Sequence, residues 1–417
     1  MAMPPVITYF ELSNGLRCVH CLTGAAVEYC GVSVDAGSRD DFPGMDGLAH
    51  FVEHTIFKGT THRRSWHIIN RMESCGGELN AYTTKESTVV YSVFPYGNFA
   101  RAAELISDLV CNSVFPQKEI DREREVVADE ISSYLDMPSE AVFDDFEDLI
   151  FAGSPLGHNI LGNEESLGKF TPEVCRDYLT AYYNNKRMVM FYAGPMPSEK
   201  VRRVAERYFA SVPVAGAAMP VSGIDVLKRG KPSVRPCFDE IRDLGIHQAH
   251  TVMGARIPDM FSPERHAVAM LVNMLGGPGM NSLLNVALRE KRGLVYSVDA
   301  STSLLTDTGL FTLYFGCDAD DVERCRDVVS GILSDLASHP ISNVRLDKVK
   351  RQYLGQIAVA SDNRENAVLS MARSVLYHGA VVSPSERTEI IKSITPDDML
   401  RAASYLAPER LSVLTFR

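Results

Sequence analysis

A stretch rich in glycine and proline near the middle of the chain most constrains how it can fold. Val212–Lys231 and the residue after it contain Pro213, Gly216, Pro220, Gly223, Gly230 and Pro232, with no strong helical period. Residues of these two types interrupt helices and strands, so such a run is typical of a linker. At about 100–200 residues per domain, 417 residues suggest two or three domains. The stretch therefore predicts two domains of similar length, at residues 1–215 and 216–417.

Strands and helices alternate on both sides of this linker. The first half is expected to hold strands at 15–21, 27–35, 78–82, 88–94 and 187–193, and helices at 46–58, 65–74, 100–112 and 116–135. The helix at 46–58 is expected to start at Asp46 and to stop before Gly59. The second half is expected to hold strands at 247–256, 295–303 and 309–315 and a helix at 263–275.

The two halves share a sequence of features that indicates a weak internal duplication. Each half contains an apolar-rich helix, a Gly-Gly turn and a strand ending in Tyr-Ser-Val, at 91–93 and at 296–298. Repetition in the same order is the signature of duplicated supersecondary units.

The charge balance excludes one class of partner. The formal net charge is −11, and residues 1–215 carry all of it, with 19 Lys and Arg against 30 Asp and Glu. Nucleic-acid binding requires a basic face, so no nucleic-acid partner is expected.

Localisation is predicted from what the sequence lacks. The N-terminal residues do not form a secretory signal, and no apolar run reaches the ~18 residues of a membrane span. The nine cysteines are odd in number and scattered, which is typical of free thiols in a reducing compartment. The sequence therefore predicts a cytoplasmic protein without a membrane partner.

The motif His50-Phe51-Val52-Glu53-His54 carries the chemistry, and it falls on the helix expected at 46–58. Residues four apart lie on one helix face, so both imidazoles can bind one Zn²⁺ at about 2.0–2.1 Å. Glu53 lies on nearly the same face and is close enough to take a proton from a water molecule at the metal. The order H-x-x-E-H is that of the inverted zincins.

A catalytic zinc ion needs a third protein ligand and one open position. Glu123 and Glu130, in the segment EREVVADE, are seven residues apart and share a helix face. One of them could bind the metal while the other supports it electrostatically, and the spacing does not distinguish them.

Together these segments resemble the inverzincin metallopeptidases of the pitrilysin/insulinase family, in the short-chain branch that includes mitochondrial processing peptidase and its bacterial relatives. The resemblance covers nearly the whole chain. It rests on HFVEHTIFKGT (50–60), GGELNAYTTKESTVVYS (76–92), EREVVADEI (123–131), SPLGHNILG (154–162) and ITPDDML with LAPERLSV (394–413).

The resemblance implies a zinc metalloendopeptidase with one Zn²⁺ per chain. Its zinc ligands would be His50, His54 and Glu130, its general base Glu53, and Glu123 a carboxylate near the site. The implied fold is α+β, with two related domains, each an antiparallel sheet of about six strands with helices packed on one face. Residues 1–215 would form the zinc-binding domain, and residues 216–417 the homologous domain without zinc.

The resemblance also implies how substrate is held. Members of this length generally work as dimers that close around a chamber, with Arg289 and Tyr296 of the far wall holding the substrate carbonyl. The strand around Asn80, Ala81 and Tyr82 resembles the edge to which a peptide adds as an extra strand. The zinc motif and the pair Arg289 and Tyr296 lie in one chain, so a homodimer is expected to contain all the parts of the active site.

One segment departs from the family pattern: GGPGMNSLLNVA (276–287) has Pro278 in its glycine run and Leu283 where relatives often carry Arg. The expected activity is cleavage of peptides or unfolded segments, with basic peptides favoured by the acidic first half. The alternatives are a non-catalytic structural or maturation subunit, and one half of a heterodimeric processing peptidase that needs a paralogous partner.

Overall fold

The computed structural model describes residues 6–216 and 229–417, and these form two compact units. Unit 1 comprises Met1–Ser132, His158–Arg229 and Asn363–Val381, and unit 2 comprises Ser133–Gly157, Gly230–Asp362 and Val382–Arg417, within those described ranges. The bulk of each sequence half therefore lies in one unit, but each half also contributes a segment to the other. Most of the expected linker, residues 217–228, lies outside the described residues.

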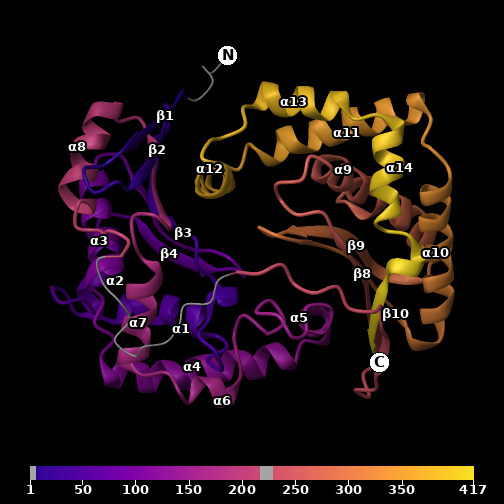
Figure 1. Ribbon diagram of the computed structural model, residues 1–417, viewed down its shortest axis with the longest axis horizontal. Coiled ribbons are helices and arrows are strands. Elements are labelled where there is room, and N and C mark those ends of the chain that lie inside the picture. The colour runs from indigo at the N-terminus through magenta and orange to yellow at the C-terminus, as the bar shows by residue number, and fades with distance from the viewer. Residues whose placement is uncertain (1–5, 217–228) are drawn as a thin grey trace. The chain divides into compact units, whose positions relative to one another are not determined.

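Unit 1 is built on a six-stranded sheet with the order β1-β2-β6-β3-β5-β4 (Figure 1). Its strands are β1 Val6–Glu11, β2 Arg17–Leu22, β3 Val27–Val34, β4 Glu78–Thr83, β5 Thr88–Pro95 and β6 Met188–Gly194. The β2–β6 pair is parallel and the other pairs are antiparallel. β4 therefore forms one edge of this sheet.

Helices cover both faces of the unit 1 sheet. Its main core includes residues of α1 Leu48–Thr55, α2 Ser65–Glu73, α3 Phe99–Asn112, α4 Gln117–Leu135, α7 Pro172–Tyr182 and α8 Ser198–Phe209. The opposite face packs against α12 Arg364–His378, which comes from the second half of the sequence. This second layer explains why every residue of β6 is buried, because an apolar strand cannot leave one face in water.

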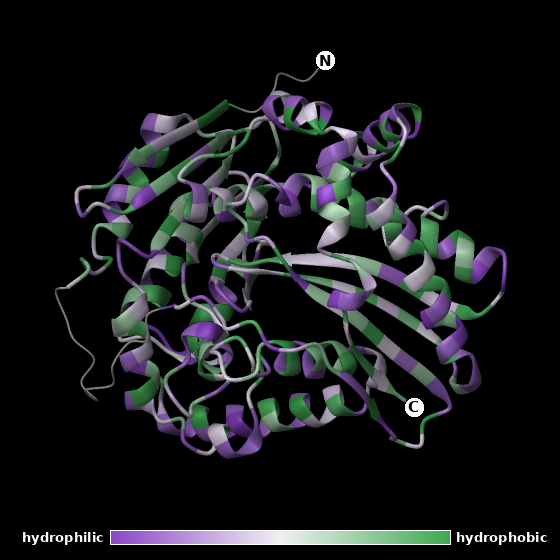
Figure 2. Cartoon of the chain, turned by 45° about the vertical axis from the view of Figure 1, so that its right-hand side comes forward, coloured by the Kyte–Doolittle hydropathy of each residue, from purple (hydrophilic) through white to green (hydrophobic). Residues whose placement is uncertain are grey.

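Unit 2 is built on a five-stranded sheet with the order β7-β11-β8-β10-β9. Its strands are β7 Asp239–Arg242, β8 Gln248–Ile257, β9 Val295–Leu304, β10 Gly309–Asp318 and β11 Ser412–Phe416. One face packs against α9 Arg265–Gly276, α10 Val322–Ser338, α11 Asn343–Ala360, α13 Pro384–Ser393 and α14 Pro396–Ser404. The other face packs against α5 Pro138–Ile150, which comes from the first half of the sequence. Hydrophobic and hydrophilic residues alternate along the helices of the chain (Figure 2), as expected of helices with one buried and one solvent face.

The two sheets share one topology, which supports the internal duplication. The order β2-β6-β3-β5-β4 corresponds to β7-β11-β8-β10-β9, and in each sheet the first two of these strands are parallel. The Tyr-Ser-Val segments are not equivalent, however. Residues 91–93 lie in β5, whereas 296–298 lie in β9, the counterpart of β4. The predicted α+β fold with two related units is confirmed, but the expected antiparallel sheets with helices on one face are not. Each sheet contains one parallel pair, and helices cover both of its faces because α12 and α5 add a second layer.

The helix that carries the two histidines differs from its predicted bounds. It begins at Leu48 rather than at Asp46, because Gly47 in the left-handed region (φ 90°) precedes it and forms its N-cap. It ends at Thr55 and continues as a single 3-10 turn, Ile56–Lys58. All nine cysteines are free thiols. Within the part of the chain that the structure describes, no helix is long and apolar enough to cross a membrane.

Candidate metal centre

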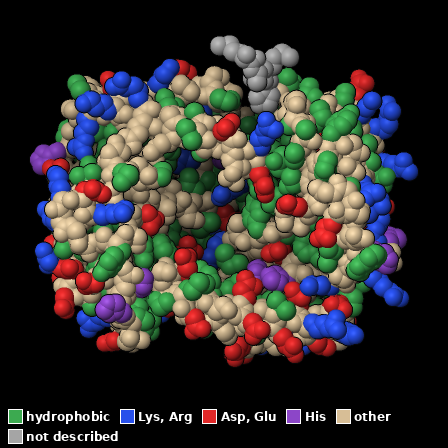
Figure 3. Space-filling view, turned by 180° about the vertical axis from the view of Figure 1, so that it is seen from behind, with side chains coloured by type: hydrophobic (Ala, Val, Ile, Leu, Met, Phe, Trp, Pro, Cys, Tyr) green, Lys and Arg blue, Asp and Glu red, His purple; other side chains and the backbone are tan. Residues whose placement is uncertain are grey.

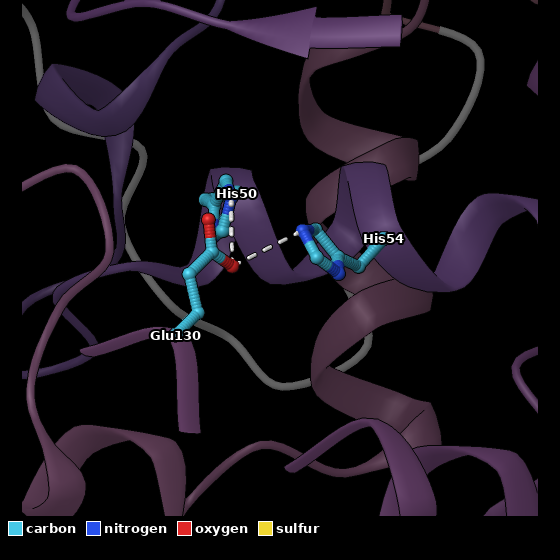
Figure 4. A group of neighbouring side chains, drawn as sticks. All are labelled: His50, His54 and Glu130. Atoms are coloured by element: carbon cyan, nitrogen blue, oxygen red, sulfur yellow. Dashed lines mark ion pairs between the residues drawn. The ribbon is translucent and has the colours of Figure 1, made fainter. Parts of the chain in front are cut away.

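α1 presents both histidines on one face because its other face is anchored in the core of unit 1. Phe51 and Val52 are fully buried, which fixes the rotation of this two-turn helix. The rings of His50 and His54 then lie 4.5 Å apart, centroid to centroid. Glu130 approaches from α4, and its Oε2 atom lies 3.9 Å from His50 Nε2 and 3.6 Å from His54 Nε2 (Figure 4).

The three side chains fit a zinc ion. Their ligand atoms all lie within 4.8 Å of one another, and no other such group of His, Cys, Asp and Glu occurs among the described residues. Tetrahedral zinc with ligands at about 2.0–2.2 Å holds ligand atoms about 3.3 Å apart, so only small rotations would close the set. Two imidazole nitrogens and one carboxylate oxygen are a usual donor set for a catalytic zinc, with a fourth position left open.

The structure distinguishes the two glutamates that the spacing left open. Glu130 joins the cluster, whereas Glu123 is buried behind His54, with its Oε1 atom 3.1 Å from His54 Nδ1. Glu123 Oε2 also accepts from the ammonium of Lys58 at 2.7 Å. In the neutral imidazole of His54, an Nδ1–H that donates to Glu123 leaves Nε2 as the acceptor, and this atom faces Glu130.

Burial and neighbouring charges shift the protonation of these groups. Burial, together with the charge of His54, lowers the pKa of His50 to about 4. Burial also lowers the pKa of His54, but the hydrogen bond to Glu123 and three carboxylate charges outweigh it, so this pKa is raised. For Glu123, burial is outweighed by the contacts with His54 and Lys58, which lower its pKa.

Glu53 lies beside the cluster without belonging to it. Burial raises the pKa of its carboxyl group against the opposing effects of His54 and of a hydrogen bond from Thr83. Thr83 Oγ1 donates to Glu53 Oε2 at 3.4 Å. Thr83 and Lys58 were not among the site residues predicted from the sequence. The available signals were that Lys58 follows His54 by one helical turn and that Thr83 directly follows Tyr82.

The expected substrate strand lies next to the metal cluster. Asn80, Ala81 and Tyr82 belong to β4, which packs against α1. Among the described strands β4 pairs only with β5, so its outer edge is not paired with another strand. An unpaired edge offers backbone N–H and C=O groups to an added strand.

Arg289 and Tyr296 both lie in unit 2. Arg289 lies on the π-helix Asn285–Glu290 and is exposed, lining a cavity of about 420 Å³. Pro278 lines the same cavity, so the departure from the family pattern falls beside Arg289. Tyr296 lies on β9 with 63% of its surface exposed, and its hydroxyl donates to Asp318 Oδ1 at 3.0 Å.

Two family models together match most of the chain. The first, described as insulinase (peptidase family M16), matches residues 23–164, which include the whole metal cluster. The second, described as the peptidase M16 inactive domain, matches residues 169–353, which include Arg289 and Tyr296.

Curated relatives are similar over nearly the full length. The mitochondrial-processing peptidase subunit beta of Saccharomyces cerevisiae is 30% identical, with 95% of this chain and 87% of that protein covered. An uncharacterized zinc protease of Streptomyces coelicolor is 29% identical, with 96% and 87% covered. An uncharacterized zinc protease of Mycobacterium tuberculosis is 30% identical, with 96% and 90% covered.

Solved structures share the fold. A protease from Helicobacter pylori superposes with a TM-score of 0.90 at 20% identity, covering 99% of this chain and all of that one. With the metal cluster in the matched region and relatives named as zinc proteases, the chain belongs to the insulinase family of zinc peptidases, peptidase family M16.

Proposed function

We propose that this chain is a zinc-dependent endopeptidase that hydrolyses peptides or unfolded segments. The observation that carries the proposal is the cluster of His50, His54 and Glu130 with the carboxylate of Glu53 beside it. A non-catalytic subunit would not need to keep both the zinc ligands and the base.

His50, His54 and Glu130 would hold one zinc ion. When bound, zinc polarises a scissile carbonyl and lowers the pKa of water that it holds. Glu53 then takes the proton of the attacking water and passes it to the leaving amine. Burial raises the pKa of Glu53 toward the ambient pH. This suits both steps, because a group that accepts and returns a proton works best when its pKa lies near that pH.

The edge of β4 would hold the peptide as an added strand. Backbone pairing along Asn80, Ala81 and Tyr82 gives affinity without demanding one sequence. The next residue of β4, Thr83, donates to Glu53, so a peptide paired along this edge would run beside the general base.

Arg289 and Tyr296 would stabilise the negative charge that develops on the carbonyl oxygen. We propose that they act across a closed homodimer, on the zinc site of the other protomer. Mixed dimers test this arrangement, using Glu53→Gln and Arg289→Ala chains that are each inactive alone. A dimer of one chain of each kind then retains one site with both groups intact, so mixing should restore activity. No recovery from mixed dimers of confirmed composition would contradict the arrangement.

Unit 1, which contains the metal cluster, carries a smaller negative net charge than residues 1–215. Six acids within Asp136–Asp148 belong to unit 2, and unit 1 carries 23 Lys and Arg against 26 Asp and Glu, a formal net charge of −3. Acidic side chains still gather along the lower edge of one face (Figure 3), and Glu119, Asp121, Glu125 and Asp129 lie on α4, the helix of Glu130. We propose that basic peptides are favoured and that salt weakens this preference. A cleavage profile indifferent to substrate charge at low salt would count against it.

Glu53→Gln tests the core of the proposal, with Glu125→Gln as a control because Glu125 is an exposed glutamate on α4. We expect Glu53→Gln to bind zinc normally and to lose about 10²–10⁴-fold in the turnover of a quenched peptide. With an uncharged quenched peptide, which the acidic side chains of α4 do not attract, the control should match the unaltered chain in both measurements. Full turnover by Glu53→Gln would show that the assigned base is wrong.

A further inference from the structure

The helix that carries His50 and His54 starts without a cap of its own. Its N-cap residue is Gly47, which has no side chain to accept hydrogen bonds from the first amides. Asp41 takes this role from outside the helix: its Oδ2 atom accepts from Gly47 N and its Oδ1 atom from Ala49 N, both at 2.7 Å. Ala49 directly precedes His50, so Asp41 holds the backbone at the first metal ligand.

Asp41 is itself braced by a histidine that lies 117 residues away. His158 Nε2 lies 3.2 Å from Asp41 Oδ2, and the histidine side chain is 14% exposed. Burial raises the pKa of Asp41 to about 6, and the contact with His158 opposes this rise and favours the ionised carboxylate. Lys85 Nζ donates to the backbone oxygen of His158 at 2.5 Å, which fixes the position of the histidine.

The backbone after His158 packs directly on the turn that starts α1. A Cβ atom on Gly47 would lie 2.5 Å from the oxygen of Leu161, and one on Gly162 would lie 2.1 Å from the oxygen of Asp46. His158 is also the point at which the chain returns to unit 1 after Ser133–Gly157, a segment that begins three residues after Glu130. One end of that segment therefore continues the helix of Glu130, and the other end leads into the residue that contacts Asp41.

We propose that Asp41 and His158 are positioning residues for the metal centre, which hold the start of α1 so that His50 faces Glu130. This inference rests on the proposed zinc peptidase function and adds to it two residues outside the H-x-x-E-H motif. It also gives a role to SPLGHNILG, which the catalytic assignment leaves unused. Neither residue belongs to the metal cluster, so their effect passes through the geometry of α1.

The test compares His158→Leu, which cannot donate to Asp41, with His158→Gln, whose amide can. The control is His62→Leu, because His62 Nδ1 pairs with the buried Asp108 at 2.6 Å in the same unit. Zinc affinity is measured on the full chain by competition with a chelator. The absorption spectrum of the cobalt(II)-loaded chain reports ligand geometry independently of activity, and unfolding of the metal-free chain reports stability.

We expect His158→Leu to weaken zinc binding about tenfold or more and to change the cobalt spectrum, since supporting partners of metal ligands have effects of this size. His158→Gln should recover most of the affinity, and His62→Leu should leave affinity and spectrum unchanged even where it lowers stability. Zinc affinity within twofold and an unchanged spectrum in His158→Leu would overturn the inference.

Should His158→Leu not fold, Asp41→Asn decides, because asparagine keeps one acceptor and loses the other. Weakened zinc binding in this variant with near-normal binding in His158→Gln would support the inference, and normal binding in both would overturn it. If the unaltered chain bound neither zinc nor cobalt, the proposed function would fail and this inference with it.

Discussion

Replacing Glu123 with glutamine should weaken zinc binding while leaving all three ligands in place. The Glu123 carboxylate makes two contacts, to His54 Nδ1 at 3.1 Å and to Lys58 Nζ at 2.7 Å, and its side chain is 8% exposed. A glutamine amide has one oxygen and no charge, so it can keep only one of the two contacts as an acceptor. Either His54 or Lys58 then loses its partner.

The size of the effect follows from these contacts. A hydrogen bond to a charged group contributes about 1.5–3 kcal/mol to stability, but part of that loss is common to the metal-free and metal-bound chains. The remainder acts through the orientation and basicity of His54 and is expected to cost about 10–100-fold in zinc affinity. At 1.4 kcal/mol per factor of ten, this corresponds to about 1.4–2.8 kcal/mol.

Competition with a chelator at pH 7.5 measures this change. Glu125→Gln is the matched control, because it makes the same chemical change two residues further along α4 at an exposed position. Unfolding of the metal-free variants separates a loss of fold from a loss of ligand orientation. Zinc affinity within twofold of the unaltered chain in Glu123→Gln, with the control equally unaffected, would refute the role of the buried carboxylate.

Three further changes test the surroundings of the site. Burial raises the pKa of Asp108, but hydrogen bonds from several side chains outweigh burial and lower it. The stabilisation that Asp108 gives to the folded chain is therefore present above its pKa in the unfolded chain. It is lost as the pH falls through its pKa in the folded chain. Asp108→Asn should therefore lower the free energy of unfolding by denaturant by about 2 kcal/mol at pH 7, and by less as the pH falls below 4. An equal loss at pH 7 and below pH 4 would contradict this. Gly162→Ala should cost more than Gly153→Ala in the same assay, because both glycines have positive φ but an added Cβ meets backbone atoms only at Gly162. Thr83→Val removes a hydrogen bond to Glu53 and should lower kcat about two- to tenfold at constant KM. An unchanged kcat would show that this hydrogen bond does not contribute to catalysis.

Local periodicity was sufficient for the parts of this protein that depend on neighbours in the chain. His50 and His54 share a face because a helix turns once in 3.6 residues, whatever surrounds it. Likewise, strand alternation predicts that Cys18 and Cys21 of β2 point to opposite faces, and they pack in two different cores. These relations are short-range, so a single sequence contains them.

Other features depended on how distant segments pack. Glu123 and Glu130 share a helix face, and only the placement of α4 against α1 showed that one joins the cluster and the other braces His54. The exchange of α5 and α12 between units could not be read from the chain either, because each helix pairs its apolar face with a sheet formed elsewhere in the sequence.

The start of α1 shows the same division. The sequence predicted that the helix starts at Asp46, whereas in the structure it starts at Leu48 and its first amides donate to Asp41, which His158 braces. Helical periodicity sets which residues can face a metal, because it is a property of the backbone alone. Which carboxylate binds, which one braces and what holds the helix in place are decided by contacts between residues far apart in the chain, and these exist only once unit 1 has folded.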